Sequence, residues 1–228
     1  MEDLLKKAAD LFPGYLRDLI ALITGPRQFV AHKLNKRSPL EPALLFLGIS
    51  VAINFLLKLP LSDENPAIEI LRTAAFSLVL WTLAGGVIWI AWRIAGGAGS
   101  LVRTLAIGFY YFGVLEYLMS LTVLAIVGTL KEIDPVVYQT VLKAIHEGRV
   151  VALVNQVDLL DTTGLRLALV ALGIGAIAAL VWMLAGWGGF AAVHKVHGPR
   201  MVVAFVVAVA LWIPVWALTG VMASAMAP

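Results

Sequence analysis

The sequence contains no cysteine and few charged residues. Of its 228 residues, 17 are lysine or arginine and 14 are aspartate or glutamate. The charged fraction of 14% lies well below the roughly 25% of an average soluble domain. Without cysteine the chain has no disulfide, thiolate nucleophile, iron–sulfur cluster or cysteine-containing zinc site. The net charge of +3 is too small to indicate nucleic acid as a partner.

The chain also has too few polar side chains to cover a soluble fold. Apolar residues make up 61% of it, whereas a soluble domain has about 45–50%. A soluble domain of this size leaves much of its surface in water, so it cannot bury that many apolar side chains. The composition therefore excludes a disordered chain, disfavours a soluble enzyme and predicts an integral membrane protein in contact with the lipid bilayer.

Five stretches are long and apolar enough to cross a bilayer. A hydrocarbon core about 30 Å thick needs roughly 20 residues of helix, and continuous apolar runs fit helices better than alternating barrel strands. Backbone groups in lipid find no water to bond, so each run must form a helix. We therefore predict an all-α, polytopic membrane helix bundle with five transmembrane helices in one domain over residues 39–228, with spans at about 40–59, 70–93, 103–130, 164–193 and 201–225.

Basic residues are distributed unequally between the two sides of these spans. Eleven lysines and arginines lie on the side of the N-terminus and six on the opposite side, which also carries eight acidic residues. Since lysine and arginine are enriched in cytoplasmic loops, we expect the N-terminus in the cytoplasm and the C-terminus outside. The first 39 residues hold no short apolar region with a small-residue cleavage site, so we expect the first span to act as its own insertion signal.

Residues 1–38 are predicted to form a cytoplasmic N-terminal amphipathic segment. Apolar residues recur at helical spacing in its first part, and Pro13-Gly14 is expected to end that helix. A second apolar piece, Tyr15–Ile23, is expected to stop at Gly25-Pro26. Two interpretations stay open: a helix lying on the cytoplasmic leaflet near anionic lipids, or a lid packed on the bundle.

One sizeable loop, Lys131–Thr163, lies on the outer side. Asp134 followed by Pro135 has the form of a helix N-cap with proline at the first helical position. The apolar residues after it share one face, and those over 150–157 share another. We predict two short interfacial helices here, followed by a cap at 161–163 for the fourth span.

Glu116 is the one acidic residue deep within a span. An ionisable group in hydrocarbon is costly unless it is paired, protonated or in contact with water, so it is a candidate functional residue. In one interpretation it handles protons for a transporter; in the other it is a neutral glutamate that hydrogen-bonds a neighbouring helix. The polar side chains considered within its reach are Asn54, Tyr110, Tyr111, Tyr117 and Ser120. The spans hold no second carboxylate to complete a relay, which favours the structural interpretation.

The remaining candidates lie on the cytoplasmic side of the spans. They are the basic residues Arg27, Lys33, Lys36, Arg37, Arg103 and Arg200, together with His194 and His197. In one interpretation the stretch 27–37 and the turns 96–103 and 194–200 form one docking surface; in the other, the charges only fix the orientation. The two histidines have no third ligand for a metal ion. The glycine-rich residues 96–99 lack the strand and the lysine of a phosphate loop, so they are expected to form a tight turn.

Five of the tryptophans lie at sequence positions where interfacial residues are expected. Tryptophan rings prefer the level of the lipid headgroups, where the indole N–H meets water. We therefore expect these side chains to anchor the spans at the two interfaces: Trp81, Trp89, Trp92, Trp182 and Trp187.

Four short motifs follow one another along the chain. They are Thr24-Gly25-Pro26-Arg27-Gln28-Phe29, Ser38-Pro39-Leu40-Glu41-Pro42-Ala43, Gly96-Gly97-Ala98-Gly99-Ser100 and His197-Gly198-Pro199-Arg200. In this order they resemble the Yip family of Ypt/Rab-interacting membrane proteins, and specifically its prokaryotic branch. The resemblance covers about residues 15–225. It implies a Yip domain in the bacterial cytoplasmic (inner) membrane, and it carries over no catalytic residue.

The resemblance also sets expectations about function. Eukaryotic Yip proteins bind prenylated Rab GTPases and act in vesicle trafficking and membrane shaping, and their upstream Asp-Leu-Tyr/Trp-Gly-Pro motif is replaced here by residues 22–26. No catalytic or cofactor motif occurs in this sequence, so we expect a non-catalytic scaffold or adaptor that engages a protein partner or lipid at its cytoplasmic face. The alternative is a small transporter or permeability factor that uses the Glu116 region. The sequence sets no oligomeric state.

Overall fold

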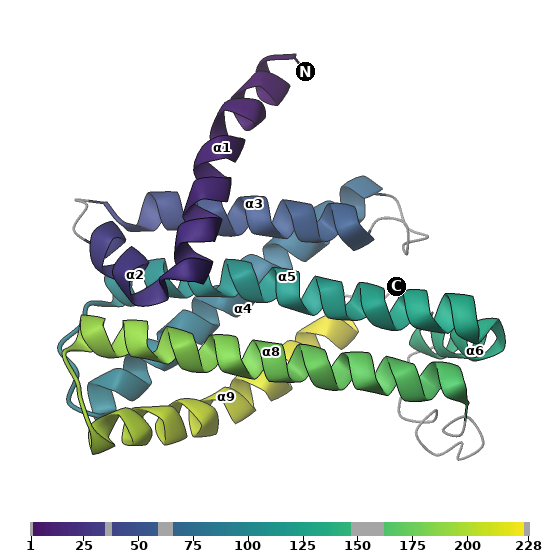
Figure 1. Ribbon diagram of the computed structural model, residues 1–228. Helices are drawn as coiled ribbons and strands as arrows, with labels where there is room; N and C mark the ends of the chain where they lie inside the picture. Colours follow the sequence, from purple (N-terminus) through teal and green to yellow (C-terminus); the bar gives the residue numbers. More distant parts are fainter. Residues whose placement is uncertain (1, 35–37, 59–65, 147–161, 226–228) are drawn as a thin grey trace.

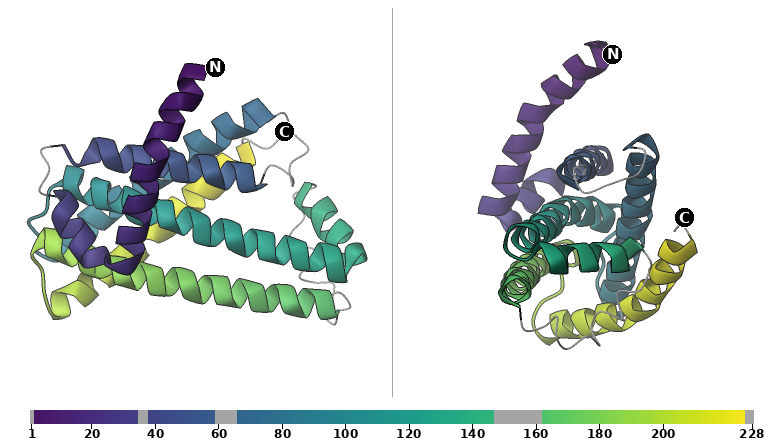
Figure 2. Two further views of the ribbon diagram at one scale, coloured as in Figure 1. Left: turned by 45° about the horizontal axis from the view of Figure 1, so that its top comes forward. Right: turned by 90° about the vertical axis from the view of Figure 1, so that its right-hand side faces the viewer.

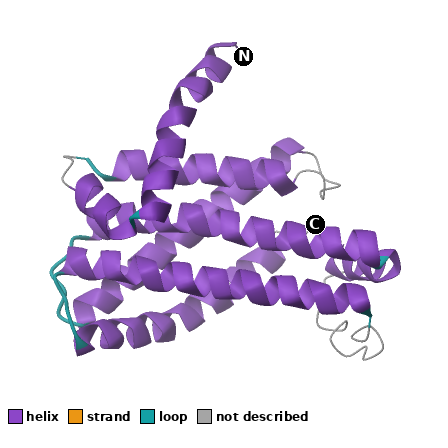
Figure 3. Ribbon diagram, viewed as in Figure 1, coloured by secondary structure: helices purple, strands orange, loops and turns teal. Residues whose placement is uncertain are grey.

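The computed structural model describes residues 2–34, 38–58, 66–146 and 162–225. Within these ranges the chain is helical, with short turns between the helices (Figure 3). The helices are α1 (Glu2–Thr24), α2 (Pro26–Leu34), α3 (Leu40–Lys58), α4 (Pro66–Ile94), α5 (Leu101–Ile133), α6 (Pro135–His146), α8 (Thr163–His194) and α9 (Pro199–Ala225).

Four of these helices are long and apolar enough to cross a membrane. Their apolar parts are Leu40–Leu57, Ile70–Ile94, Leu101–Ile133 and Thr163–His194. A shorter apolar stretch, Pro199–Val215, lies in α9. The prediction of an all-α integral membrane protein is confirmed, and the long helices begin and end within a few residues of the predicted spans.

The long helices surround α5. Helices α3, α4 and α8 all pack against α5, while α9 packs chiefly against α4. In Figure 1, α3, α5 and α8 lie roughly parallel, and α4 and α9 cross behind them. Because α5 has neighbours on several sides, its residues 106–116 are buried without interruption. A helix that is apolar all round is expected in such a central place.

Glycines let two neighbours approach α5 closely. A Cβ atom at Gly113 of α5 would lie 2.7 Å from both the Phe46 ring and the Ser50 hydroxyl of α3. A Cβ atom at Gly186 of α8 would lie 2.8 Å from the Tyr111 ring of α5. Small residues at helix contacts are typical of membrane bundles, because they let backbones come together.

Helix α1 runs through Pro13, which corrects the predicted break at that position. Proline inside a helix removes one hydrogen bond and usually kinks the helix, but the helical path continues on both sides of it. The next turn supplies Tyr15, and Leu22 follows two turns later; both are buried in the core of the bundle. Tertiary packing therefore overrides the local preference. The predicted stop at Gly25 is confirmed, since α2 begins at Pro26.

The N-terminal segment shares its core with the membrane helices. Tyr15 and Leu22 of α1 and Phe29 and Val30 of α2 belong to the same buried cluster as residues of the bundle. Helix α1 passes across α3 and α5, and its N-terminal end points away from the bundle (Figures 1 and 2). The second half of α1 is therefore packed on the bundle, as the lid interpretation required.

Both helix caps predicted for the outer side are present. The Asp134 carboxylate accepts a hydrogen bond of 3.2 Å from the Val137 N–H at the start of α6. The Thr162 hydroxyl accepts one of 3.3 Å from the Leu165 N–H at the start of α8. The second interfacial helix predicted over 150–157 lies outside the described residues.

Candidate functional site

Glu116 lies in the middle of the bundle, where α3, α4 and α5 meet. Its side chain is buried, and both carboxylate oxygens accept hydrogen bonds. Oε1 accepts from the Trp81 indole N–H at 2.7 Å and from the Ser77 hydroxyl at 3.1 Å. Oε2 accepts from the Asn54 side-chain amide. Two neighbouring helices therefore hold this carboxylate with three donors.

Ser120 completes the group, which we call the polar cluster: Asn54, Ser77, Trp81, Glu116 and Ser120. The Ser120 hydroxyl bonds the Asn54 carbonyl oxygen and also lies 2.7 Å from the Glu116 backbone carbonyl. On α4 and on α5 the members are four residues apart, so each pair occupies one helix face. The polar cluster thus joins the inward faces of three helices.

A second set of hydroxyls attaches α1 beside the polar cluster. The Tyr15 hydroxyl hydrogen-bonds Ser50 of α3 at 3.1 Å and also bonds the Tyr117 hydroxyl of α5. Ser50 lies one turn before Asn54 of the polar cluster and donates to the Phe46 carbonyl at 2.9 Å. Burial raises the pKa of the Tyr15 phenol well above its ordinary value, so this group stays neutral.

Sequence reasoning found part of this arrangement. Asn54 was predicted near Glu116, and the structure confirms the contact. Tyr117 was also expected near Glu116 but pairs with Tyr15. Ser77 and Trp81 were missed. They were detectable in principle, because their spacing of four residues puts two hydrogen-bond donors on one face of the charge-free stretch 73–92.

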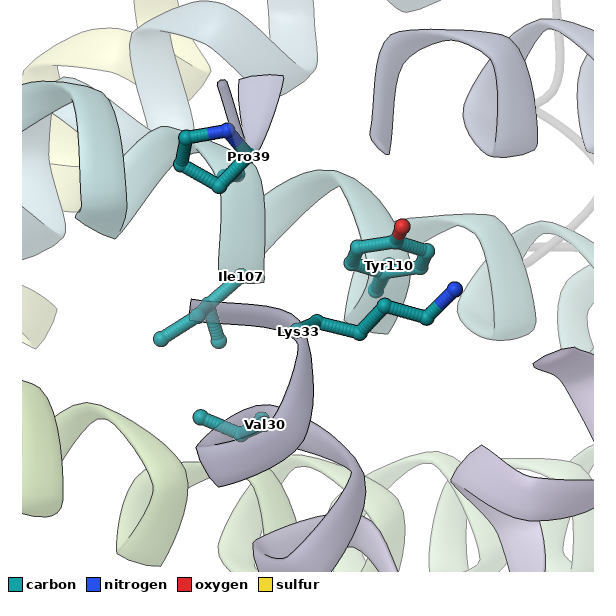
Figure 4. Close-up of a pocket in the computed structure, with 6 residues that line it drawn as sticks. Val30, Lys33, Pro39, Ile107 and Tyr110 are labelled. Atoms are coloured by element: carbon teal, nitrogen blue, oxygen red, sulfur yellow. The ribbon is translucent and has the colours of Figure 1, made fainter. Parts of the chain in front are cut away.

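Lys33 is buried, which corrects its prediction as a cytoplasmic surface residue. Its ammonium pairs with the Asp18 carboxylate of α1 and lies 5.3 Å from the centre of the Phe29 ring and 5.8 Å from that of Tyr110. Figure 4 shows its side chain running beneath the Tyr110 ring. The void beside it measures about 10 Å³, too small for a ligand. The long alkyl stem of lysine allows this burial while the charge is paired.

His194 is also buried, at 1% exposure, and is likewise removed from the surface candidates. Its Nε2 lies 2.9 Å from the Thr104 hydroxyl, and its ring stacks on Trp92 with centroids 5.5 Å apart. The glycine-rich turn wraps around the imidazole: a Cβ atom at Gly99 would lie 2.8 Å from Nδ1. The Ala98 N–H donates to the His194 carbonyl at 3.1 Å. The turn predicted at 96–99 therefore also forms the site in which this histidine side chain packs.

The other surface candidates within the described residues are exposed, and the structure brings their segments together. Arg27 of α2 lies against α8, since a Cβ atom at Gly188 would lie 2.9 Å from its Nε. Arg200 of α9 lies beside the glycine-rich turn, with Nη1 3.6 Å from the position of a Cβ atom at Gly96. The exposed candidates are Arg27, Arg103, His197 and Arg200, while Lys36 and Arg37 lie outside the described residues.

The tryptophans predicted as interfacial anchors join helices to one another. Trp81 and Trp92 are buried. The indole N–H of Trp182 donates to the Tyr111 carbonyl at 2.9 Å, and that of Trp187 to the Met201 carbonyl at 3.1 Å. These two carbonyls replace the headgroup water that an interfacial indole would bond, and the burial of Trp81 and Trp92 likewise corrects their prediction as interfacial anchors. Trp89, the fifth, is partly buried and donates to the Gly99 carbonyl at 3.1 Å.

Comparison of the chain with known proteins adds no identification. No family model, no curated protein and no solved structure matches it. The resemblance to the Yip family therefore stays a prediction from the four sequence motifs.

Proposed function

We propose that this protein is a non-catalytic, Yip-type membrane scaffold or adaptor that engages a protein partner or lipid with its cytoplasmic face. It crosses the bilayer five times in this proposal, with α9 as the fifth span. The 27 residues of α9 make a helix about 40 Å long, which exceeds the roughly 30 Å of hydrocarbon. The unequal distribution of basic residues supports a cytoplasmic N-terminus, and the resemblance to the prokaryotic Yip branch supports a place in the inner membrane of a bacterial cell.

One observation carries the proposal: three segments far apart in sequence meet at one end of the bundle. Helix α2 packs on α8, and the Ala98 N–H bonds the His194 carbonyl, which joins the 95–100 and 194–198 turns. Together they present exposed basic side chains, among them Arg27, Arg103 and Arg200. Each basic group near an anionic leaflet contributes about 1 kcal/mol of attraction, so the surface suits acidic protein segments or anionic lipid.

The bonding of Glu116 supports a scaffold over the transporter alternative. Its three donors all come from α3 and α4, so the carboxylate links helices of the bundle. A proton carrier in the membrane needs a water-lined path or a second titratable group. Within the described parts of the spans, no second carboxylate lies near Glu116.

Cross-linking in native membranes tests the proposal. The triple variant R27Q/R103Q/R200Q removes three exposed charges from the proposed cytoplasmic surface and, because these side chains are exposed, should keep the fold. We expect it to lose cross-linked partners or anionic lipid that the wild type retains. The matched control K131Q removes an exposed charge at the opposite end and should change nothing. If the triple variant keeps the same cross-linked partners and lipids as the wild type, the basic residues serve only to orient the protein in the membrane.

A further inference from the structure

A large cavity lies between α4, α5, α8 and α9. Its volume is about 510 Å³, and side chains of all four helices line it. The right-hand view of Figure 2 looks along the bundle, with α4 and α9 on one side of this region and α5 and α8 on the other. The cavity lies where α9 packs chiefly against α4 and contacts α8 through Trp187, which bonds the Met201 carbonyl and packs on the Phe205 ring.

The walls of the cavity are apolar and rich in aromatic rings. Trp81 and Phe112 stack on each other with centroids 4.5 Å apart on one side, and Trp182, Trp187 and Phe190 line the other. The indole N–H groups of these tryptophans are all bonded within the protein, to Glu116 or to backbone carbonyls. The rings therefore offer hydrocarbon surface, and their donors are not available to a polar ligand.

The mouth of the cavity faces the bilayer. Three lining residues on its rim, Met119 of α5, Met183 of α8 and Val209 of α9, are 52%, 52% and 51% exposed. Met183 lies eleven residues before the end of α8 at His194, which is about 16 Å along the helix. This places the mouth among the acyl chains of the membrane, below the level of the headgroups.

An empty space of this kind is unfavourable in a packed protein. Interiors hold few voids larger than a water molecule, and rings that face a void lose their dispersion contacts on that side. Water does not replace those contacts, because apolar cavities stay dry. The volume lies within the roughly 300–1,000 Å³ of small-molecule sites. The surrounding bilayer supplies hydrocarbon chains at the depth of the mouth.

We propose that this cavity is a binding site for a hydrocarbon chain of a membrane lipid, which enters from the bilayer between Met183 and Val209. The chain end packs against Trp81, Phe112 and Trp187, and the headgroup stays outside the cavity. This inference goes beyond the scaffold function, because it uses neither the basic cytoplasmic surface nor any protein partner.

Photolabelling in vesicles tests the site. The protein is reconstituted with phosphatidylcholine that carries a diazirine near the end of one acyl chain, and labelled peptides are mapped by mass spectrometry. Ala208 is buried in the cavity wall, whereas Ala210, two residues on, is exposed. A208F should fill the cavity and A210F should add the same ring on the outer surface. Ala84 offers a second filling position on α4.

The expected result is labelling of inward residues such as Leu115 and Gly186 in the wild type and in A210F, with loss of that labelling in A208F and A84F. Labelling of outward residues such as Leu172 should be equal in all four proteins, which shows that each is folded and inserted. Wild-type labelling confined to outward residues would overturn the proposal. So would inward labelling that survives both filling variants, or a cavity shown by cross-linking to be covered by a second protein helix.

Discussion

Glu116 shows how a bundle accommodates one carboxylate in hydrocarbon. The cost of burying such a group falls when each oxygen has hydrogen-bond donors of good geometry. Three groups donate to it here: the Trp81 indole N–H at 2.7 Å, the Ser77 hydroxyl at 3.1 Å and the Asn54 side-chain amide. Since the donors belong to two other helices, the same bonds that satisfy the carboxylate also fix the relative positions of α3, α4 and α5.

The polar cluster predicts a difference between two substitutions of Glu116. In E116Q the new carbonyl can accept from Trp81 and Ser77, and a flip of the Asn54 amide lets its oxygen face the new NH2 group. Ser120 then accepts from Asn54 and donates to the backbone carbonyl 2.7 Å away. We expect E116Q to be nearly silent. E116L leaves three buried donors without their acceptor and should destabilise the protein by about 1–3 kcal/mol for each donor that stays unpaired.

Thermal unfolding in detergent, together with a growth or transport assay, separates the two interpretations of Glu116. The matched pair serves as its own control, because both variants remove the carboxylate and only one removes the hydrogen bonds. An E116Q protein that folds like the wild type but has lost function would establish a protonic role and contradict the structural one.

The tight packing of His194 against the glycine-rich turn gives a second prediction at the scale of one residue. A methyl group at Gly99 would lie 2.8–2.9 Å from three ring atoms of the imidazole. The ring cannot move away easily, because it is stacked on Trp92. G99A should therefore destabilise the protein by about 1–3 kcal/mol, the usual cost of overpacking. Gly173 is the control, since a Cβ atom there meets nothing within 4 Å.

In thermal unfolding, G99A should lower the midpoint, while G173A should leave it unchanged or raise it slightly, since alanine favours a helix. Equal midpoints for G99A and the wild type would mean that the turn yields freely, and that the tight packing of the histidine contributes little to stability.

At the scale of elements, α1 has two apolar sides with different environments. Tyr15 and Leu22 face the bundle. Phe12, Leu16, Ile20 and Ile23 recur at helical spacing on a neighbouring side and are exposed. An exposed apolar stripe suits a helix at a bilayer surface. The lid and the interfacial helix are therefore compatible descriptions of this element.

The ion pair between Asp18 and Lys33 joins α1 to α2 and predicts how the lid is held. The two side chains are only 18% and 11% exposed, so D18N leaves the lysine charge largely buried without its partner. The cost should be about 1–3 kcal/mol, below the roughly 3–5 kcal/mol of a fully buried pair. With a reporter cysteine at Leu22, which is fully buried, D18N should speed up its reaction with a maleimide.

Two controls make this experiment specific. R17Q removes a neighbouring charge that is 80% exposed and should leave the reaction rate unchanged. The double variant D18N/K33M removes both charges and should restore slow labelling, since no unpaired charge is then left buried. If D18N labels no faster than R17Q, the ion pair does not hold α1 on the bundle.

Elements were more predictable from the sequence than the surroundings of single side chains. Apolar runs and caps such as Asp134 and Thr162 act locally, so helix positions could be read directly. The prediction that the helix ends at Pro13 was wrong, because the packing of the following turns decides whether the helix continues. Lys33 and His194 were assigned to the surface from their polarity, yet α2 and the glycine-rich turn bury them. Such burial depends on which segments pack together in the fold, and the spacing of residues along the sequence does not indicate it.

At the scale of the whole molecule, the helices differ widely in how much lipid they face. In the most apolar window of α3, 39% of residues are buried, against 6% in that of α8. Helix α8 packs chiefly on α5, and α9 turns away from it toward α4. The large cavity results from this arrangement. It could not be predicted from the sequence, because each helix alone is a uniformly apolar run.

The five-span arrangement predicts which positions of the chain are accessible from outside the cell. The chain has no cysteine, so single cysteines can be placed at Ser62, Ser100, Thr162 and Ser224 without a background. Since the basic residues favour a cytoplasmic N-terminus, an impermeant maleimide added outside should label all of these positions except Ser100. Labelling after the membrane is opened checks that Ser100 is reactive. Outside labelling of Ser100 would mean that the orientation is the reverse of the predicted one. Protection of Ser224 alone would mean that α9 does not cross the bilayer.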